Sequence, residues 1–245
     1  MTPRRVLALL AAAGLLLAAC GGSSKKSTTT TTASPPTTAA STTTTTANPA
    51  STDKEAVALN ASILTPAEVK AALGTDVVVY TGQGGRPTVP SGPLSLAGVV
   101  SVFPSPIYQT SLEQAKASVG ANVGYADPKA MIVFDILAIK FESGTTGKTF
   151  VAAATQIATG FGGAKPADHP ELKVGLLPGS LLRVPPAAGA NPPTETVVGS
   201  GLYDSGVYYQ IAGVAAPGTV TDAVIVKLLQ AQDAKYAKIK ASVAG

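Results

Sequence analysis

Residues 21–52 consist mostly of Thr, Ser, Ala and Pro with scarcely a large apolar side chain, and this tract limits what the chain can fold. Such a segment cannot bury enough apolar surface to offset the entropy lost on ordering, so we expect a disordered tether. As a flexible coil it would span roughly 30 Å, and its Thr, Ser and Pro content suits mucin-like O-glycosylation. The fold must therefore be built from residues 53–245, which are enough for one sizeable core.

An apolar run, Val6–Ala19, precedes the tract and follows Arg4 and Arg5. As a helix the run would be about 21 Å long, which is shorter than the bilayer hydrocarbon core of about 30 Å. A charged start, a short apolar middle and a small-residue end are typical of a secretory signal peptide. A buried core helix fits less well, because the run is apolar on every face and a tether follows it.

The one cysteine of the chain, Cys20, closes this run in the sequence Leu17-Ala18-Ala19-Cys20. The segment resembles the lipobox of bacterial lipoproteins. The resemblance implies cleavage between Ala19 and Cys20, a diacylglycerol on the Cys20 thiol, and acylation of the new amine by a chain such as palmitate. It places the chain at the extracytoplasmic face of the cell membrane, held there by lipid. The alternative is an ordinary signal peptide with an incidental cysteine.

These features predict three parts. Residues 1–19 are a lipoprotein signal peptide, residues 20–52 are the lipidated cysteine with its tether, and residues 53–245 are a globular extracytoplasmic domain. With its only thiol modified, the domain has no disulfide available and must be held together by its core.

The mildly basic balance of the chain, +4 with a pI near 9.1, does not belong to the globular part. Four of the 18 basic residues (Arg4, Arg5, Lys25 and Lys26) precede residue 53. The globular part, residues 53–245, therefore has 14 basic and 14 acidic residues. A neutral domain gives no reason to expect nucleic acid as a partner.

The clearest element of the globular part is a helix over 66–73, in "ILTPAEVKAALG". Thr65 stands as its N-cap, Glu68 completes a capping box, and Gly74 supplies the C-terminal stop.

The rest of the pattern predicts further strands and helices. Strands are expected over 77–81, 94–103, 130–141 and 180–184, a hairpin turning at 204–206, and helices over 111–119 (capped by Ser111 and Gln114), 145–159 and 220–243. The strand over 130–141 is almost continuously apolar, which predicts a central strand covered on both faces. The expected fold class is α+β: a single domain with a mixed or mainly antiparallel sheet packed against helices, including a long C-terminal helix.

The opening "ILTPAEVKAALG" and the closing "LLQAQDAKY" resemble pieces of the extracytoplasmic domains of actinobacterial lipoproteins and of kinase sensor domains. The resemblance implies a ligand- or partner-binding module at the cell envelope, and it transfers no catalytic residue. Those sensor domains often carry disulfides, whereas this chain has none.

Metal and nucleophile chemistry has little support in the sequence. The single histidine, His169, lies beside Asp168 and Glu171, but a zinc site needs three or four ligands, so we expect a solvated loop histidine. Ser200 lacks the Gly-x-Ser-x-Gly elbow of serine hydrolases and lies in an expected strand. A serine paired with Lys140 or Lys148 is left open, without local support.

Other candidate groups also have plain explanations. A carboxylate pair for glycoside chemistry could come from Asp135 and Glu142, but the chain has no tryptophan to stack on a sugar. Arg86 and Arg183 could each bind an anion, and we expect each to be exposed or locally paired.

Two groups of side chains depend on where the elements turn them. Lys235, Lys238 and Lys240 gather at the end of the last helix, where cations complement the helix dipole. Tyr208 and Tyr209 are adjacent in a strand and should point to opposite faces.

The sequence therefore favours a non-enzymatic lipoprotein that binds an envelope protein or a ligand and needs no cofactor. A carrier of apolar molecules such as lipids is the alternative, because the domain is rich in aliphatic residues. An envelope hydrolase is the least favoured hypothesis.

Overall fold

The computed structural model describes residues 50–80, 90–103, 106–162, 165–169, 172, 174–177 and 179–243. The expected signal peptide, Cys20, nearly all of the tether, Arg86 and Glu171 lie outside the described residues. No helix among the described segments is long and apolar enough to span a membrane.

The described elements alternate between helices and strands. The helices are α2 (Lys54–Ser62), α3 (Pro66–Leu73), α4 (Leu96–Val102), α5 (Pro106–Gln114), α6 (Gly144–Gly162) and α7 (Asp222–Val243). The strands are β1 (Val78–Val79), β2 (Gly92–Ser95), β3 (Ala117–Asp127), β4 (Ile132–Phe141), β5 (Lys165–Asp168), β6 (Ser180–Val184), β7 (Glu195–Leu202) and β8 (Val207–Ala215).

The strands form one eight-stranded sheet in the order β1-β3-β4-β8-β7-β6-β5, with β2 also paired to β3, and every strand pairing is antiparallel. The described chain enters at one edge, where the Ser51 amide donates to the carbonyl of Pro93, 3.0 Å away. The α+β fold class, with a single domain and a long C-terminal helix, is confirmed.

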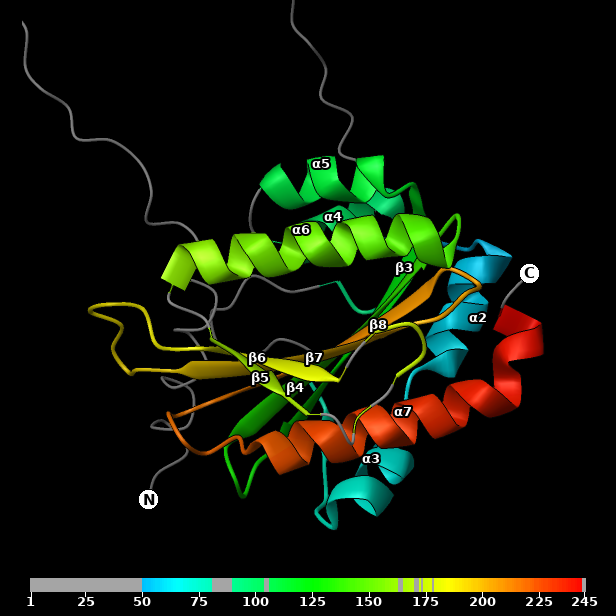
Figure 1. Ribbon diagram of the computed structural model, residues 1–245. Helices are drawn as coiled ribbons and strands as arrows, with labels where there is room; N and C mark the ends of the chain where they lie inside the picture. Colours follow the sequence, from blue (N-terminus) through cyan, green and yellow to red (C-terminus); the bar gives the residue numbers. More distant parts are fainter. Residues whose placement is uncertain are drawn as a thin grey trace, which may run out of the picture.

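Helices cover the sheet in two layers (Figure 1). Helices α2, α3 and α7 lie against one face, and their apolar side chains join those of the sheet in the larger of two buried clusters. Helices α4, α5 and α6 lie against the other face over a smaller, more aromatic cluster. The central strand β4 contributes alternate residues to both clusters, which explains its nearly continuous apolar sequence.

Helix α3 follows its sequence signals. The Thr65 hydroxyl accepts a hydrogen bond from the Glu68 amide at 3.3 Å, and the Glu68 carboxylate accepts one from the Thr65 amide at 2.7 Å. Gly74 ends the helix at φ 74°. The capping box and the glycine stop are therefore confirmed.

Most other expected elements are present with shifted ends. The hairpin of β7 and β8, the central strand β4, the strand β6 and the helices α6 and α7 are where the sequence predicts them. The expected strand over 77–81 is represented by β1, which is two residues long.

The prediction of a strand over 94–103 was wrong. Strand β2 ends at Ser95, whose hydroxyl accepts a hydrogen bond from the Gly98 amide at 3.2 Å and so caps α4. The length and periodicity of a short apolar run do not distinguish a buried helix from a buried strand. Here the N-cap of Ser95 favours a helix for the residues that follow it.

The helix expected over 111–119 was also misplaced. Helix α5 ends at Gln114, and the Ser111 hydroxyl donates to the Ile107 carbonyl inside that helix instead of capping its start. The eleven-residue strand β3 follows, and the sequence did not predict it. Its small residues permit close packing: a Cβ on Gly120 would lie 2.5 Å from the Val99 side chain of α4 and 2.7 Å from the Ala138 carbonyl. The short strand β5 was missed as well.

Candidate binding site on the half-open face of the sheet

The two faces of the sheet are closed to different degrees. Along β7 and β8, residues that face α7, such as Val197, Tyr209 and Ile211, are buried. Their alternate neighbours on the α6 side are half-buried, except at one end, where Leu202 and Tyr208 are buried. We call this half-buried patch the open face: Asp135, Leu182, Val198, Ser200, Gln210 and Ala212.

Strand register makes the open face continuous. Ala212 lies between Asp135 of β4 and Val198 of β7. Val198 in turn lies opposite Leu182 of β6, and Ser200 lies opposite Gln210. Adjacent strands are about 4.8 Å apart, so these side chains lie next to one another on one surface.

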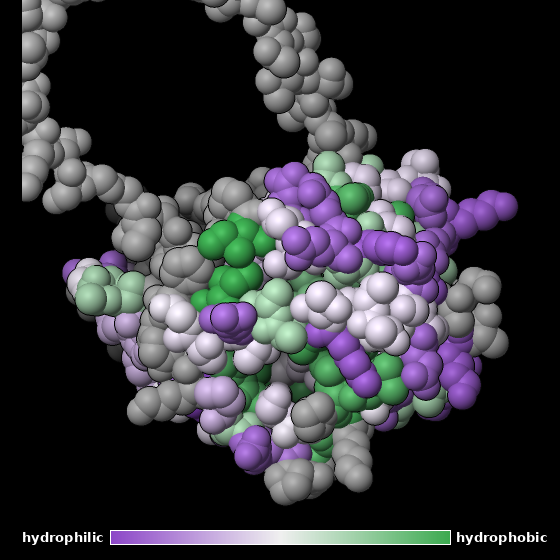
Figure 2. Space-filling view, turned by 45° about the horizontal axis from the view of Figure 1, so that its top comes forward, coloured by the Kyte–Doolittle hydropathy of each residue, from purple (hydrophilic) through white to green (hydrophobic). Residues whose placement is uncertain are grey.

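Helix α6 approaches the sheet closely near its start. A Cβ on Gly144 would lie 2.8 Å from the Tyr203 carbonyl, and one on Gly147 would lie 2.6 Å from the Leu202 side chain. Phe150 of the next turn is fully buried, whereas Ala154 and Ile157 further along are half-buried. The helix therefore closes one end of this face. Figure 2, which brings this side forward, shows green apolar surface among the polar surface.

Aromatic side chains form the closed end. Tyr208 packs against Phe150 and Phe141, with ring centroids 5.6 and 6.2 Å apart. Half-buried Phe103 and Tyr108 stack on each other at 4.9 Å beside them. Burial raises the pKa of the Tyr108 and Tyr208 phenols, so both stay protonated at neutral pH.

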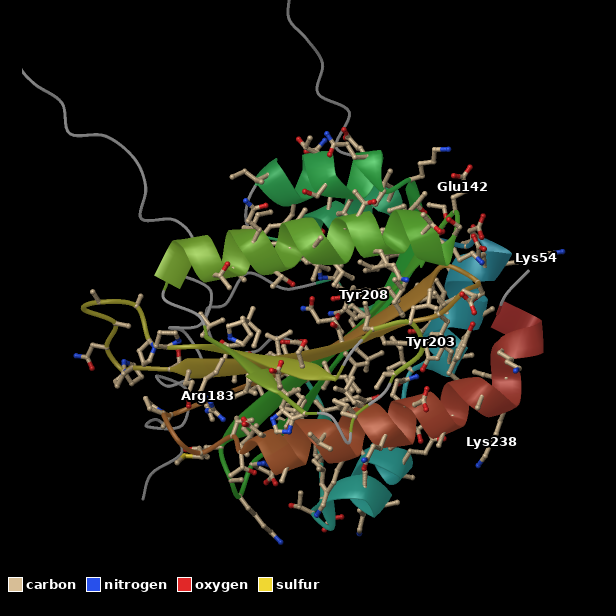
Figure 3. All side chains as sticks on the ribbon, in the orientation of Figure 1. Lys54, Glu142, Arg183, Tyr203, Tyr208 and Lys238 are labelled. Atoms are coloured by element: carbon tan, nitrogen blue, oxygen red, sulfur yellow. The ribbon has the colours of Figure 1, made fainter. Side chains whose placement is uncertain are left out.

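Where the closed aromatic end meets the open face, the buried Tyr208 contacts the half-buried Gln210. The hydroxyl of Tyr208 donates to Gln210 Oε1 at 3.1 Å, and Tyr208 is only 3% exposed. In Figure 3, Tyr208 lies between the sheet and α6. Gln210 Nε2 has no acceptor among the described residues, so the amide presents its donors on the half-open surface.

The cation nearest in sequence to this patch is already paired. The Arg183 guanidinium forms ion pairs with Glu195, at 2.8 Å, and with Asp222, and both of its terminal nitrogens reach the Val220 carbonyl at 3.4 Å. The hydrogen bond to Glu195, and then that to Asp222, raise the pKa of Arg183 against the opposing effect of burial. The expectation of a locally paired arginine is confirmed.

His169 lies beside the same cluster, in a loop as expected. Its Nε2 lies 3.4 Å from Asp222 Oδ2 and its side chain is 19% exposed, so the ring is partly buried against Asp222 and only partly solvated. No group of three or more His, Cys, Asp or Glu side chains that could hold a metal occurs within the described segments.

The two lysine candidates lie in different surroundings, and Lys148 is exposed on α6. Lys140 is buried, and its ammonium donates to the carbonyl of Ser205 at 2.9 Å and lies 3.7 Å from Glu55. The Ser205 hydroxyl instead bonds to the Tyr236 hydroxyl at 2.5 Å. Ser200 lies within β7, as expected.

The two carboxylates considered for glycoside chemistry are also apart. Glu142 pairs with Lys116 at 2.7 Å at one end of β4. Asp135 lies seven residues back along the chain, roughly 23 Å at strand spacing, opposite Ala212. The structure therefore places them too far apart for a glycosidase pair.

The lysines of α7 divide into two kinds. Lys238 and Lys240 are exposed, and Figure 3 shows Lys238 pointing away from the molecule. Lys235 instead donates to the Ile63 carbonyl and to the Glu68 carboxylate, both at 2.7 Å, and so joins α7 to the segment between α2 and α3. Lys235 was expected to complement the dipole at the end of α7, but its ammonium is engaged in these two hydrogen bonds instead.

The open face was missed from the sequence, although β7 holds a signal for it. In "TVVGSGL" the buried positions Val197, Gly199 and Gly201 alternate with Thr196, Val198 and Ser200 on the other face. The pattern shows that the faces differ, but not that α6 leaves one of them half-open.

Comparison with known proteins gives no family for this chain. No family model and no curated protein sequence matches it. Among solved structures, the chain is similar to the extracellular domain of PknH from Mycobacterium tuberculosis, with a TM-score of 0.41 and 12% identity over 78% of this chain and 98% of that one. A likeness at that level carries no argument about function.

Proposed function

We propose that this protein is a lipid-anchored extracytoplasmic binding module that acts without catalysis and holds its ligand on the open face. The anchor in this proposal is the lipobox-like segment that ends at Cys20. The binding part rests on one observation: the sheet is sealed on the α7 side and half-open on the α6 side.

The chemistry of the open face supports binding rather than turnover. Its apolar side chains, Leu182, Val198 and Ala212, adjoin the uncharged polar groups of Ser200 and Gln210. Ligand sites in proteins commonly combine an apolar lining with a few fixed polar groups. Four candidates elsewhere, Lys140, Glu142, His169 and Arg183, are engaged in contacts with other side chains or the backbone, which favours a non-enzymatic role.

A carrier of apolar molecules is the form of this proposal that the site favours. Helix α6 contacts β4, β6, β7 and β8, so it overlies the open face. The half-buried side chains of Leu182, Val198 and Ala212 offer an acyl chain a continuous apolar contact surface. Burying apolar ligand surface there would contribute about 25 cal/mol per Å².

The lone cysteine permits a direct test. In the full chain carrying Cys20→Ser, the substitution Ala212→Cys creates a unique thiol on the open face for an environment-sensitive fluorophore. Titration with sonicated lipid extract from a bacterial envelope should shift the emission to shorter wavelength, because ligand displaces water there.

The matched control is Ala237→Cys in the same background, which places the dye on the exposed side of α7. Its emission should not change. An unchanged spectrum from the Ala212→Cys chain, or equal shifts in both chains, would contradict the proposed site.

A further inference from the structure

We propose that the open face selects an uncharged amphiphile bearing an ester or amide carbonyl, and that Gln210 Nε2 donates a hydrogen bond to that carbonyl. The inference rests on the proposed function, because it names the ligand class of the same site. It follows from three features of the patch: an oriented amide, an adjoining apolar strip and its charge.

The amide is oriented by Tyr208. A primary amide has an accepting oxygen and a donating nitrogen, and the Tyr208 hydroxyl occupies the oxygen of Gln210. The phenol is held by the rings of Phe141 and Phe150, so it has little freedom to move. The group left to meet a ligand is therefore a donor, and its complement is an acceptor such as a carbonyl oxygen.

The apolar strip begins beside this donor. Ala212 is two residues from Gln210 on the same face of β8, about 7 Å along the strand. Val198 and Leu182 continue the strip across β7 and β6. A ligand whose carbonyl lies at Gln210 would place an attached acyl chain over these three side chains.

Charge favours a neutral ligand. The open face, as its six residues define it, contains one ionisable side chain, Asp135, and no cation. The guanidinium of Arg183 is already shared between Glu195 and Asp222. An anionic head group would therefore lose hydration at this patch without gaining a cation from the described residues.

The probes are methyl octanoate, which is neutral and has an ester carbonyl, and octanoate, which has the same acyl chain and a charge. Binding is measured with the dye-labelled Ala212→Cys chain. The ester should bind at least about tenfold more tightly than octanoate. Gln210→Leu should weaken ester binding about three- to tenfold, the range for one hydrogen bond, whereas Gln230→Leu on exposed α7 should leave it unchanged.

Two readouts separate recognition from a general loss of structure. The infrared carbonyl stretch of bound methyl octanoate should move to lower frequency in the parent chain but not in Gln210→Leu. Tyr208→Phe should weaken ester binding in the parent chain and have no further effect once residue 210 is leucine, because Tyr208 acts by positioning that amide. Circular dichroism and urea unfolding check that each variant folds.

The outcomes distinguish the two proposals. Tighter binding of octanoate than of the ester, or an unshifted carbonyl stretch, overturns the ligand class. Envelope lipid that shifts the dye while methyl octanoate does not also overturns the ligand class and leaves the binding site standing. No response of the dye to either material overturns both proposals.

Discussion

Tyr208 and Tyr209 are neighbours in β8, but their rings lie in separate apolar clusters on opposite faces of the sheet. The Tyr209 ring contacts Tyr203 and Tyr236 in the core beneath α7, with centroids 6.1 and 5.7 Å apart. Tyr208 closes the aromatic end of the open face against Phe150. One strand therefore supplies a structural tyrosine to the sealed side and a positioning tyrosine to the side proposed to bind.

The structural role of Tyr209 can be tested by removing its hydroxyl. Ser62 donates to the Leu59 carbonyl at 2.5 Å, so Tyr209 acts as donor to the Ser62 oxygen, also 2.5 Å away. Tyr209→Phe should lower the free energy of unfolding by about 1–2 kcal/mol, since a buried acceptor loses its partner.

Urea unfolding of the full chain measures this effect. Tyr108→Phe is the control, because that half-buried phenol has no hydrogen-bond partner among the described residues, and it should change stability by less than about 0.5 kcal/mol. Equal effects from the two substitutions would contradict the structural role given to the Tyr209–Ser62 contact.

Buried phenols should make the protein sensitive to alkali. Burial, helped by the charge of Glu68, raises the pKa of Tyr125 to about 12, and burial also raises the pKa values of Tyr203 and Tyr209. Above about pH 10 the unfolded chain releases phenol protons that the folded chain retains. The free energy of unfolding should therefore fall as the pH rises from about 10 to 12, by about 2–3 kcal/mol for Tyr125 alone.

Urea unfolding at a series of pH values tests this slope. The chain has no tryptophan, so the ultraviolet absorbance of tyrosinate reports ionisation directly. In the folded protein it should rise mostly above about pH 10 and together with unfolding, because burial raises the pKa of six of the seven tyrosines (Tyr108, Tyr125, Tyr203, Tyr208, Tyr209 and Tyr236). Ionisation of all seven tyrosines near pH 10 in a protein that stays folded would show that the phenols are not buried as described.

The turn between β7 and β8 gives a prediction with a matched control. Gly206 and Gly218 both have left-handed backbones, at φ 80° and 76°. A Cβ on Gly206 would lie 2.2 Å from the Phe141 carbonyl, whereas one on Gly218 would have no atom within 4 Å. Gly218→Ala should therefore cost only the conformational strain, about 1–2 kcal/mol.

Gly206→Ala should destabilise the protein by several kcal/mol more, because the backbone of β4 must shift as well. The midpoint of thermal unfolding, followed by circular dichroism, compares the two variants. If both lower it equally, the close approach of Gly206 to Phe141 does not hold in solution.

Local signals account for the elements that the sequence predicted correctly. Thr65, Glu68 and Gly74 define α3 through contacts within ten residues, and Gly206 does the same for the hairpin. In contrast, β3 is rich in Gly and Ala, which have little strand propensity, and it is set in the sheet by pairing with β4 and by α4 packing over Gly120. Such long-range contacts leave no short-range signature.

The candidate site was hidden for a similar reason. Gln210, Ala212 and Val198 are unremarkable as sequence, and they become a surface only through the register of three strands. Their partial exposure depends on the path of α6, a helix that ends 45 residues before β8 begins, from Gly162 to Val207. By contrast, the candidates that the sequence singled out by residue type, such as His169 and Arg183, are used in an ion-pair cluster with Asp222.

The proposed anchor gives the last prediction, and it concerns Cys20 alone. One acyl chain binds a bilayer only reversibly, since each buried methylene contributes about 0.8 kcal/mol, whereas two or three chains on one residue give lasting attachment. The chain made in a bacterium should therefore partition into the detergent phase of a Triton X-114 extraction, and mass spectrometry should find a diacylglyceryl group on an N-terminal Cys20. Cys20→Ser should move nearly all of the protein out of the detergent-phase lipoprotein pool without changing its urea unfolding, because the sequence places Cys20 before the expected tether and outside the expected globular part. A mature N-terminus at any other residue, or an unmodified Cys20 in chain recovered from the aqueous phase, would rule out the lipid anchor and leave an ordinary signal peptide.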